Sequence, residues 1–155
     1  MVAAGWPTAA HPERVPGRSA AALVAGGVSA SWPGVVESVP QARDWARRVL
    51  AGHPASDNVE LLITELAANA VAHTRSGEPG GVIAAAIRVL GAWVVVVVTD
   101  QGPPEVPLMP GDPEVLGELA EHGRGLVLVD CLADDWGTAP DRAGRSVWFR
   151  CGGVR

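Results

Sequence analysis

The sequence predicts an α/β domain of the α+β two-layer sandwich type, with helices packed on one face of a mixed, mainly antiparallel sheet. Two helix-period segments come first, and two β-rich segments separated by a glycine follow them. After a long proline-rich connection, the chain closes with one more apolar helix and two strand candidates. The expected order is therefore strand, helix, helix, strand, strand, connection, helix, strand, strand.

The first residues are expected to form a flexible leader over 1–27, because they are rich in Ala, Gly and Pro and show no hydrophobic period. The predicted folded domain spans 28–152 and starts with a short alternating strand, Val28 to Trp32. A chain of 155 residues has room for one domain with a hydrophobic core, so one site is the default expectation.

Two helices are predicted after this strand. Ser38 is a candidate N-cap for the first, which has Pro40 near its start and ends at Gly52. Ser56 is a candidate cap for the second, which runs to about His73 and carries acidic residues in its first turn, where the helix dipole favours them.

The segments 82–90 and 92–99 are predicted to pair as a hairpin around Gly91. The second reads WVVVVVT without alternation, which is typical of a central strand. Residues 101–122 contain five prolines and three glycines, and a connection this long in a compact domain is usually functional or disordered. The remaining predicted elements are a helix at 123–133 and strands at 135–138 and 145–151.

Composition and charge exclude several classes of function. The chain has 12 basic and 17 acidic residues, a formal charge of −5, which argues against a surface that neutralises many nucleic-acid phosphates. No segment reaches the roughly 18–20 continuous apolar residues of a membrane span. Cys131 and Cys151 lack metal-site spacing, so we expect reduced thiols in a cytoplasmic protein, with a redox pair as the less favoured alternative.

The stretch ELAANAVAHT, residues 65–74, places polar side chains on a helix whose other positions are apolar. On a helical projection, Glu65 and Asn69 lie one turn apart at the edge of the core-facing stripe. Taken alone, the pair is better explained as two solvated helix positions. His73 projects near the same stripe, but an ordinary helix-end histidine near the helix dipole explains it at least as well.

Two further features favour a ligand site. The predicted central strand ends in Asp100-Gln101-Gly102, where a carboxylate stands beside a glycine that permits close approach. Gly123-Arg124-Gly125 opens the next helix, and the exposed N–H groups of a helix start bind phosphate.

The motifs occur in a fixed order: ExxxN on a helix, DxG after a hairpin, a loop, and then GxGL. With these motifs in this order, the chain resembles the ATP-binding domains of the GHKL superfamily, which includes gyrases, heat-shock chaperones, histidine kinases and MutL. Within it, the chain is similar to the small anti-sigma-factor serine kinases of bacteria. The resemblance covers roughly 28–152, including the terminal GRSVWFR, and implies a Bergerat-type fold with an ATP lid.

The resemblance implies a role for each matching residue. Asn69 would be the protein ligand of a Mg²⁺ ion that bridges the phosphates of ATP. Glu65 would act as general base on the attacking hydroxyl. Asp100 would accept a hydrogen bond from the adenine amino group, and Gly102 would let the backbone pass close to the purine.

The resemblance also implies a phosphate-binding segment and two further contacts. Ser146, taken as the counterpart of a threonine in the family's last motif, would help to hold adenine through water. His73 is a further candidate contact. The residues expected to surround the phosphates are Gly123, Arg124, Gly125 and Leu126.

The expected function is that of an ATP-dependent protein serine kinase that binds a sigma factor and phosphorylates a serine of a small antagonist protein. The resemblance also suggests that the first helix supports a homodimer. Two alternatives stay open: a non-catalytic, ATP-gated module that sequesters a regulatory partner, and a kinase domain that acts on a partner's histidine in trans.

Overall fold

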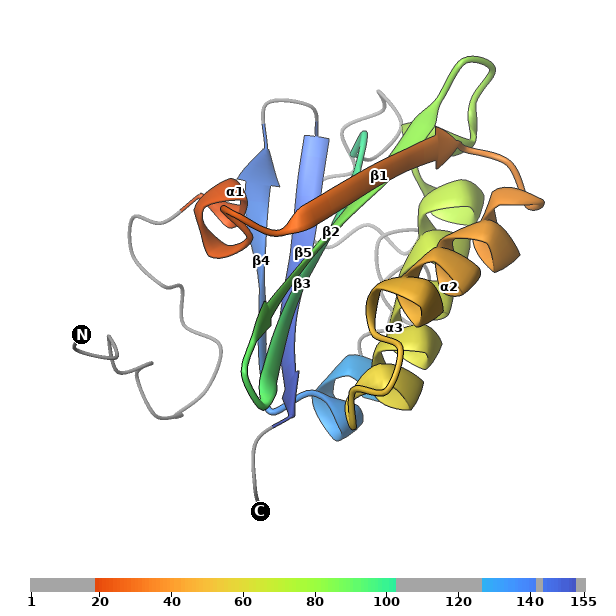
Figure 1. The fold of residues 1–155 in the computed structure, drawn as a ribbon. Helices are drawn as coiled ribbons and strands as arrows, with labels where there is room; N and C mark the ends of the chain where they lie inside the picture. The colour runs from red at the N-terminus through yellow and green to blue at the C-terminus, as the bar shows by residue number, and fades with distance from the viewer. Residues whose placement is uncertain (1–18, 103–126, 142–143, 153–155) are drawn as a thin grey trace.

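The computed structural model describes residues 19–102, 127–141 and 144–152 (Figure 1). Five strands form one sheet in the order β1-β2-β3-β5-β4, and every pairing among them is antiparallel. The predicted two-layer α+β class is therefore confirmed. The strands are β1 (Val28–Pro33), β2 (Val82–Leu90), β3 (Trp93–Asp100), β4 (Asp135–Asp141) and β5 (Gly144–Gly152).

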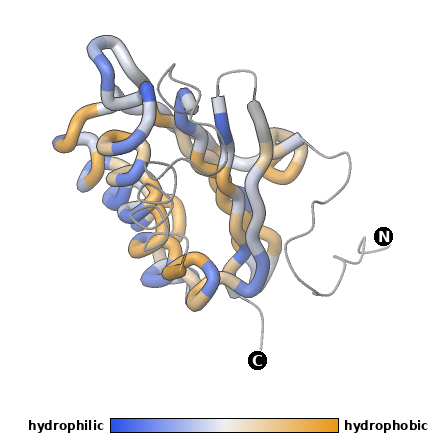
Figure 2. Tube along the Cα trace, turned by 180° about the vertical axis from the view of Figure 1, so that it is seen from behind, coloured by the Kyte–Doolittle hydropathy of each residue, from blue (hydrophilic) through white to orange (hydrophobic). Residues whose placement is uncertain are grey.

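The main helical layer covers one face of this sheet. It contains α2 (Ser38–Val49), α3 (Ser56–His73) and a short helical segment at 127–132, and the 3₁₀ turn η1 (Arg75–Gly77) follows α3 directly. Apolar side chains of α3 and of the strands form a common buried cluster, and Phe149 is its largest fully buried member. Figure 2 shows the same distribution, with the hydrophobic stretches concentrated in the central strands and in the helices beside them.

The run of valines in β3 is buried on both faces of the sheet. Val94, Val96 and Val98 belong to the cluster beneath α3, whereas Val95 and Val97 belong to a second cluster on the opposite face. Successive strand residues point to opposite sides, so a strand covered on both sides has no polar positions to alternate with. The prediction of a central strand is confirmed.

The second face carries α1 (Ala20–Leu23), which the sequence analysis did not predict. Ala20 and Leu23 are buried against Val95, Val97 and Trp148 (Figure 1). The expectation of a flexible leader through residue 27 is thus wrong for its last part, and the helices do not all lie on one face. The reason is that β3 and β5 carry apolar side chains on the face away from α3, and α1 removes these side chains from water. Residues 1–18 lie outside the described part.

Both predicted serine caps are wrong. The N-cap positions are Glu37 and Ala55, neither of which makes a side-chain cap, and Ser38 and Ser56 are the first helical residues. The turn before α3 is held by the ring of His53, whose Nδ1 accepts the Ala55 N–H at 3.1 Å. The Nε2 of the same ring lies 3.0 Å from the carbonyl oxygen of Gly91. With these partners the ring accepts at Nδ1 and donates at Nε2.

We expect His53→Ala to lower the free energy of unfolding by about 1–3 kcal/mol, because it removes two hydrogen bonds at once. His53→Asn is the matched variant, since its side-chain oxygen can still accept at the cap but cannot reach the hairpin. Urea unfolding should place it between the wild type and His53→Ala. Equal stability of all three proteins would contradict this role for the ring.

The scaffold also carries an aromatic pair and two cysteines. Trp45 is partly buried and meets Trp32 edge to face, with 5.4 Å between ring centroids. Both cysteines are free thiols, and burial, with a smaller effect of Asp134, raises the pKa of Cys151 to about 12. Within the described residues, no helix combines the length and the apolar character needed to cross a bilayer.

Candidate functional site

The polar shoulder of α3 lies beside its buried stripe. Leu62 and Leu66 are buried in the core, while Glu65 and Asn69 are only partly buried. One helical turn separates the two polar residues, a rise of about 6 Å along the axis. Among the described residues, neither side chain has a hydrogen-bond or ion-pair partner. Both are therefore free to contact a ligand or solvent.

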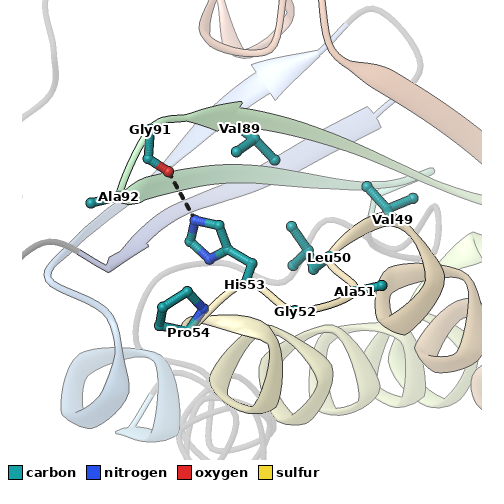
Figure 3. Close-up of a pocket in the computed structure, with 9 residues that line it drawn as sticks. All are labelled: Val49, Leu50, Ala51, Gly52, His53, Pro54, Val89, Gly91 and Ala92. Carbon is teal, nitrogen blue, oxygen red and sulfur yellow. Dashed lines mark hydrogen bonds between the residues drawn. The ribbon is translucent and has the colours of Figure 1, made fainter.

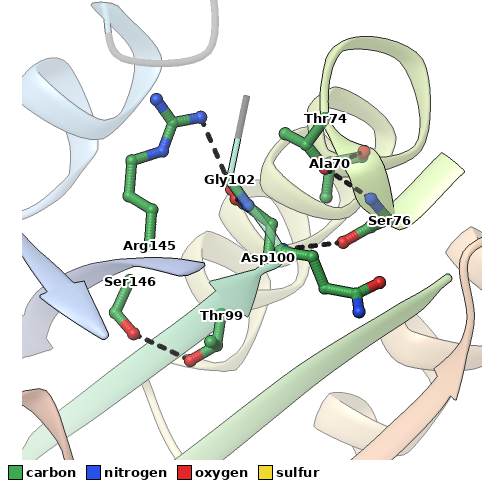
Figure 4. A network of polar contacts seen from close by, with 9 residues as sticks. Ala70, Thr74, Ser76, Thr99, Asp100, Gly102, Arg145 and Ser146 are labelled. Carbon is green, nitrogen blue, oxygen red and sulfur yellow. Dashed lines mark hydrogen bonds and ion pairs between the residues drawn. The ribbon is translucent and has the colours of Figure 1, made fainter. Parts of the chain in front are cut away.

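Asp100 ends β3 and is the candidate site's buried carboxylate, with 8% of the residue exposed. Its Oδ1 accepts the N–H of Gly102 at 2.7 Å, and its Oδ2 lies 3.5 Å from the Nη2 of Arg145 (Figure 4). Gly102 has φ of 80°, a conformation that glycine adopts without strain. This turn holds the carboxylate in one orientation at the end of the sheet.

The end of α3 is tied to the end of β3 by a network that the sequence analysis missed. The Thr74 hydroxyl donates to the carbonyl of Ala70 at 2.6 Å and accepts the Ser76 N–H at 3.1 Å. The Ser76 hydroxyl accepts the Gln101 N–H at 3.0 Å (Figure 4). The N–H of Arg75 also donates to the carbonyl of Gly102 at 2.9 Å. The shoulder of α3 and the carboxylate of β3 are thus parts of one rigid corner.

Ser146 does not join this corner. Its Oγ lies 2.8 Å from the Oγ1 of Thr99, its partner in the register between β3 and β5. Side chains alternate along β3, so Asp100 points to the same face as Val96 and Val98, the face that α3 covers. Thr99 points to the opposite face, with Val95 and Val97. The hydroxyl pair therefore lies on the opposite side of the sheet from Asp100, and the expected contact of Ser146 with adenine does not agree with this placement.

Arg145 takes the position expected of Ser146. It pairs with Asp100 in the register and shares its face, because Val147 and Phe149 on the same side of β5 pack in the cluster beneath α3. Counting back by twos from Phe149 would have found it from the sequence. Gly144 precedes it with φ of 150°, and a Cβ there would lie 2.3 Å from the carbonyl oxygen of Asp100. Only glycine allows the two strand ends to approach so closely.

Of the other predicted site residues, His73 lies in the described part of the chain, and the phosphate-binding segment does not. His73 is the last residue of α3, is partly buried and has an interaction of its own, so its role stays a prediction. The predicted lid and the phosphate-binding segment, with Gly123, Arg124, Gly125 and Leu126, lie outside the described residues. Helical segment 127–132, the next described part of the chain, packs in the core through Val129, which is fully buried.

Metal ligands do not cluster in the described part of the chain, where no group of three His, Cys, Asp or Glu side chains could hold an ion. A magnesium ion in a nucleotide site does not require such a cage, because phosphates and water supply most of its ligands. A single partly buried amide oxygen, with no partner among the residues that the structure describes, fits that need. Asn69 therefore fits the role of protein ligand to Mg²⁺.

An open groove of about 330 Å³ lies elsewhere, between the α2–α3 connection and the β2–β3 hairpin (Figure 3). It is lined by apolar residues and by His53, whose two ring nitrogens already have partners. The hairpin stands at the far end of β3 from Asp100, about 25 Å away for an eight-residue strand. This groove is therefore separate from the corner described above.

The geometry defines a class of protein, an α+β domain in which the helix α3 meets the end of the central strand β3 at one corner. Comparison with known families agrees: the model of the histidine kinase-like ATPase domain matches residues 33–151, well over half of the chain. The chain therefore belongs to the histidine kinase-like ATPase domain family, and it is an ATP-binding domain of the GHKL type. A search of curated proteins gave no match.

Proposed function

We propose that the protein is an ATP- and Mg²⁺-dependent serine kinase of the anti-sigma-factor type, which acts in the cytoplasm and regulates transcription by switching between protein partners. The observation that carries this proposal is the shoulder of α3. Glu65 and Asn69 stand one turn apart without partners among the described residues, on a helix whose end is hydrogen-bonded to the backbone that follows Asp100.

Phosphoryl transfer needs a nucleophile, a γ-phosphate and a base held together. In this proposal Asn69 would hold the metal, which when bound neutralises charge on the phosphates. Glu65 would take the proton from a serine hydroxyl of the partner. The serine oxygen then bonds to the γ-phosphorus, the bond from that phosphorus to the bridging oxygen breaks, and ADP leaves with the electron pair.

Asp100 supports base recognition in this proposal. Its Oδ1 already accepts one backbone N–H, and a carboxylate has about four lone-pair positions, so it can accept a further hydrogen bond from the adenine amino group. The proposed partners are a sigma factor, held by the domain, and a small antagonist protein that carries the target serine. A homodimer belongs to the same proposal.

The purified protein, γ-labelled ATP, Mg²⁺ and the small proteins of the source cell would test the activity. The proposal predicts label on a small protein that is stable in acid and lost in base, as phosphoserine is. Acid-labile label would instead indicate a phosphohistidine and support transfer to a partner's histidine. ATP binding without any transfer would favour the non-catalytic, ATP-gated module.

A further inference from the structure

The last strand, β5, places the Arg145 cation beside the Asp100 carboxylate, the proposed acceptor for the adenine amino group. Arg145 and Asp100 are cross-strand partners on the face of the sheet that α3 covers. The Arg145 side chain is 40% exposed, whereas that of Asp100 is 11% exposed. Figure 4 shows the guanidinium extending over the end of β3, away from the Ser146 hydroxyl. A ligand that reaches Asp100 therefore also meets Arg145.

The contact between the two side chains leaves hydrogen-bonding capacity on both. The N···O distance of 3.5 Å is long for a charged pair, which commonly closes to about 2.7–2.9 Å. The Nε of Arg145 is buried and has no partner among the described residues. An arginine has five N–H donors, so most of its donors are uncommitted. The backbone N–H of Gly102, the other donor beside this carboxylate, is already committed to Asp100.

We propose that Arg145 reads the purine, by donating a hydrogen bond to ring N1 of adenine while Asp100 accepts one from the amino group. The inference rests on the proposed nucleotide site. The Watson–Crick edge of adenine presents a donor, the amino group, next to an acceptor, N1. A carboxylate and a guanidinium side by side present the complementary acceptor and donor.

The two polar residues that flank the pair in sequence are engaged elsewhere. Ser146 is turned to the opposite face, where its hydroxyl is paired with Thr99. Gln101 contributes its side-chain oxygen to the N–H of Val82 at 2.8 Å. Arg145 therefore makes direct contact with the base where the resemblance implies a hydroxyl and water.

The test is a calorimetric comparison of ATP with 1-deaza-ATP, in which a C–H group replaces N1. Loss of one charged hydrogen bond corresponds to roughly a tenfold or greater loss of affinity. Wild type should bind 1-deaza-ATP roughly tenfold more weakly than ATP. Arg145→Met should bind ATP about as weakly and no longer distinguish the two nucleotides, which is the coupling expected of two interacting groups.

Arg145→Gln keeps an amide NH₂ group as a side-chain donor and should recover part of the discrimination. This variant guards against the possibility that Arg145→Met merely folds poorly. Arg88→Met, on β2 and away from Asp100, should behave as wild type. Equal discrimination by wild type and Arg145→Met, or tighter ATP binding by Arg145→Met, would overturn the inference while leaving the ATP site standing. A wild type that binds neither nucleotide would overturn the proposed function, and the inference with it.

Discussion

Glu65→Gln is expected to lower the rate of phosphate transfer to the partner by about 10²–10⁴-fold, the usual contribution of a positioned general base. The amide keeps the size of the side chain but cannot take the serine proton. ATP affinity should stay within about twofold of wild type, because Glu65 has no partner in the described structure whose loss would disturb the site. Single-turnover transfer of labelled phosphate and calorimetry measure the two quantities separately.

Asp57→Asn is the matched control for this experiment. It makes the same carboxylate-to-amide change on the same helix, in the exposed first turn. Transfer should continue at the wild-type rate in this variant. If Glu65→Gln also transfers phosphate normally, Glu65 is not the base; if it regulates the partner normally without transfer, the protein works as an ATP-gated module.

Asn69→Ala is expected to abolish most of the gain in ATP affinity that Mg²⁺ provides. The amide oxygen is the candidate protein ligand, and the described residues offer no carboxylate cluster to replace it. We expect affinity in Mg²⁺ to fall at least about tenfold, whereas affinity in EDTA should change little. Calorimetric titrations in the two buffers give the difference directly.

Asn58→Ala provides the comparison for that variant, because Asn58 is exposed and lies on the same helix. It should retain the full magnesium effect. An Asn69→Ala protein that responds to Mg²⁺ as strongly as wild type would remove Asn69 from the metal site, without affecting the assignment of the family.

The sequence was sufficient for the elements whose pattern is set by local chemistry. The bounds of α3 and β2 agree with the prediction, because a long helical stripe and a two-residue hairpin around Gly91 leave little choice. The two caps were wrong because each helix starts at the serine itself, and before α3 the ring of His53 accepts the Ala55 N–H. The helix α1 was missed because Ala20–Leu23 is stabilised by packing on the outer face of β3 and β5, a contact that the local sequence does not indicate.

The candidate site shows the same division. Glu65, Asn69, Asp100 and Gly102 follow from local motifs, and the structure places them at one corner or on the helix that leads to it. The error at Ser146 was a shift of one residue on β5, and a shift of one residue in a strand reverses the face. Thr74 and Ser76 could not be assigned in advance, because their function is to join elements that meet only in the folded chain.

The measurement closest to the central claim is the calorimetric titration of the wild-type protein with ATP, in Mg²⁺ and in EDTA. We expect one site per chain and clearly tighter binding in Mg²⁺ than in EDTA, with most of this difference lost in Asn69→Ala. Absence of ATP binding by the folded wild-type protein in both buffers would contradict that claim.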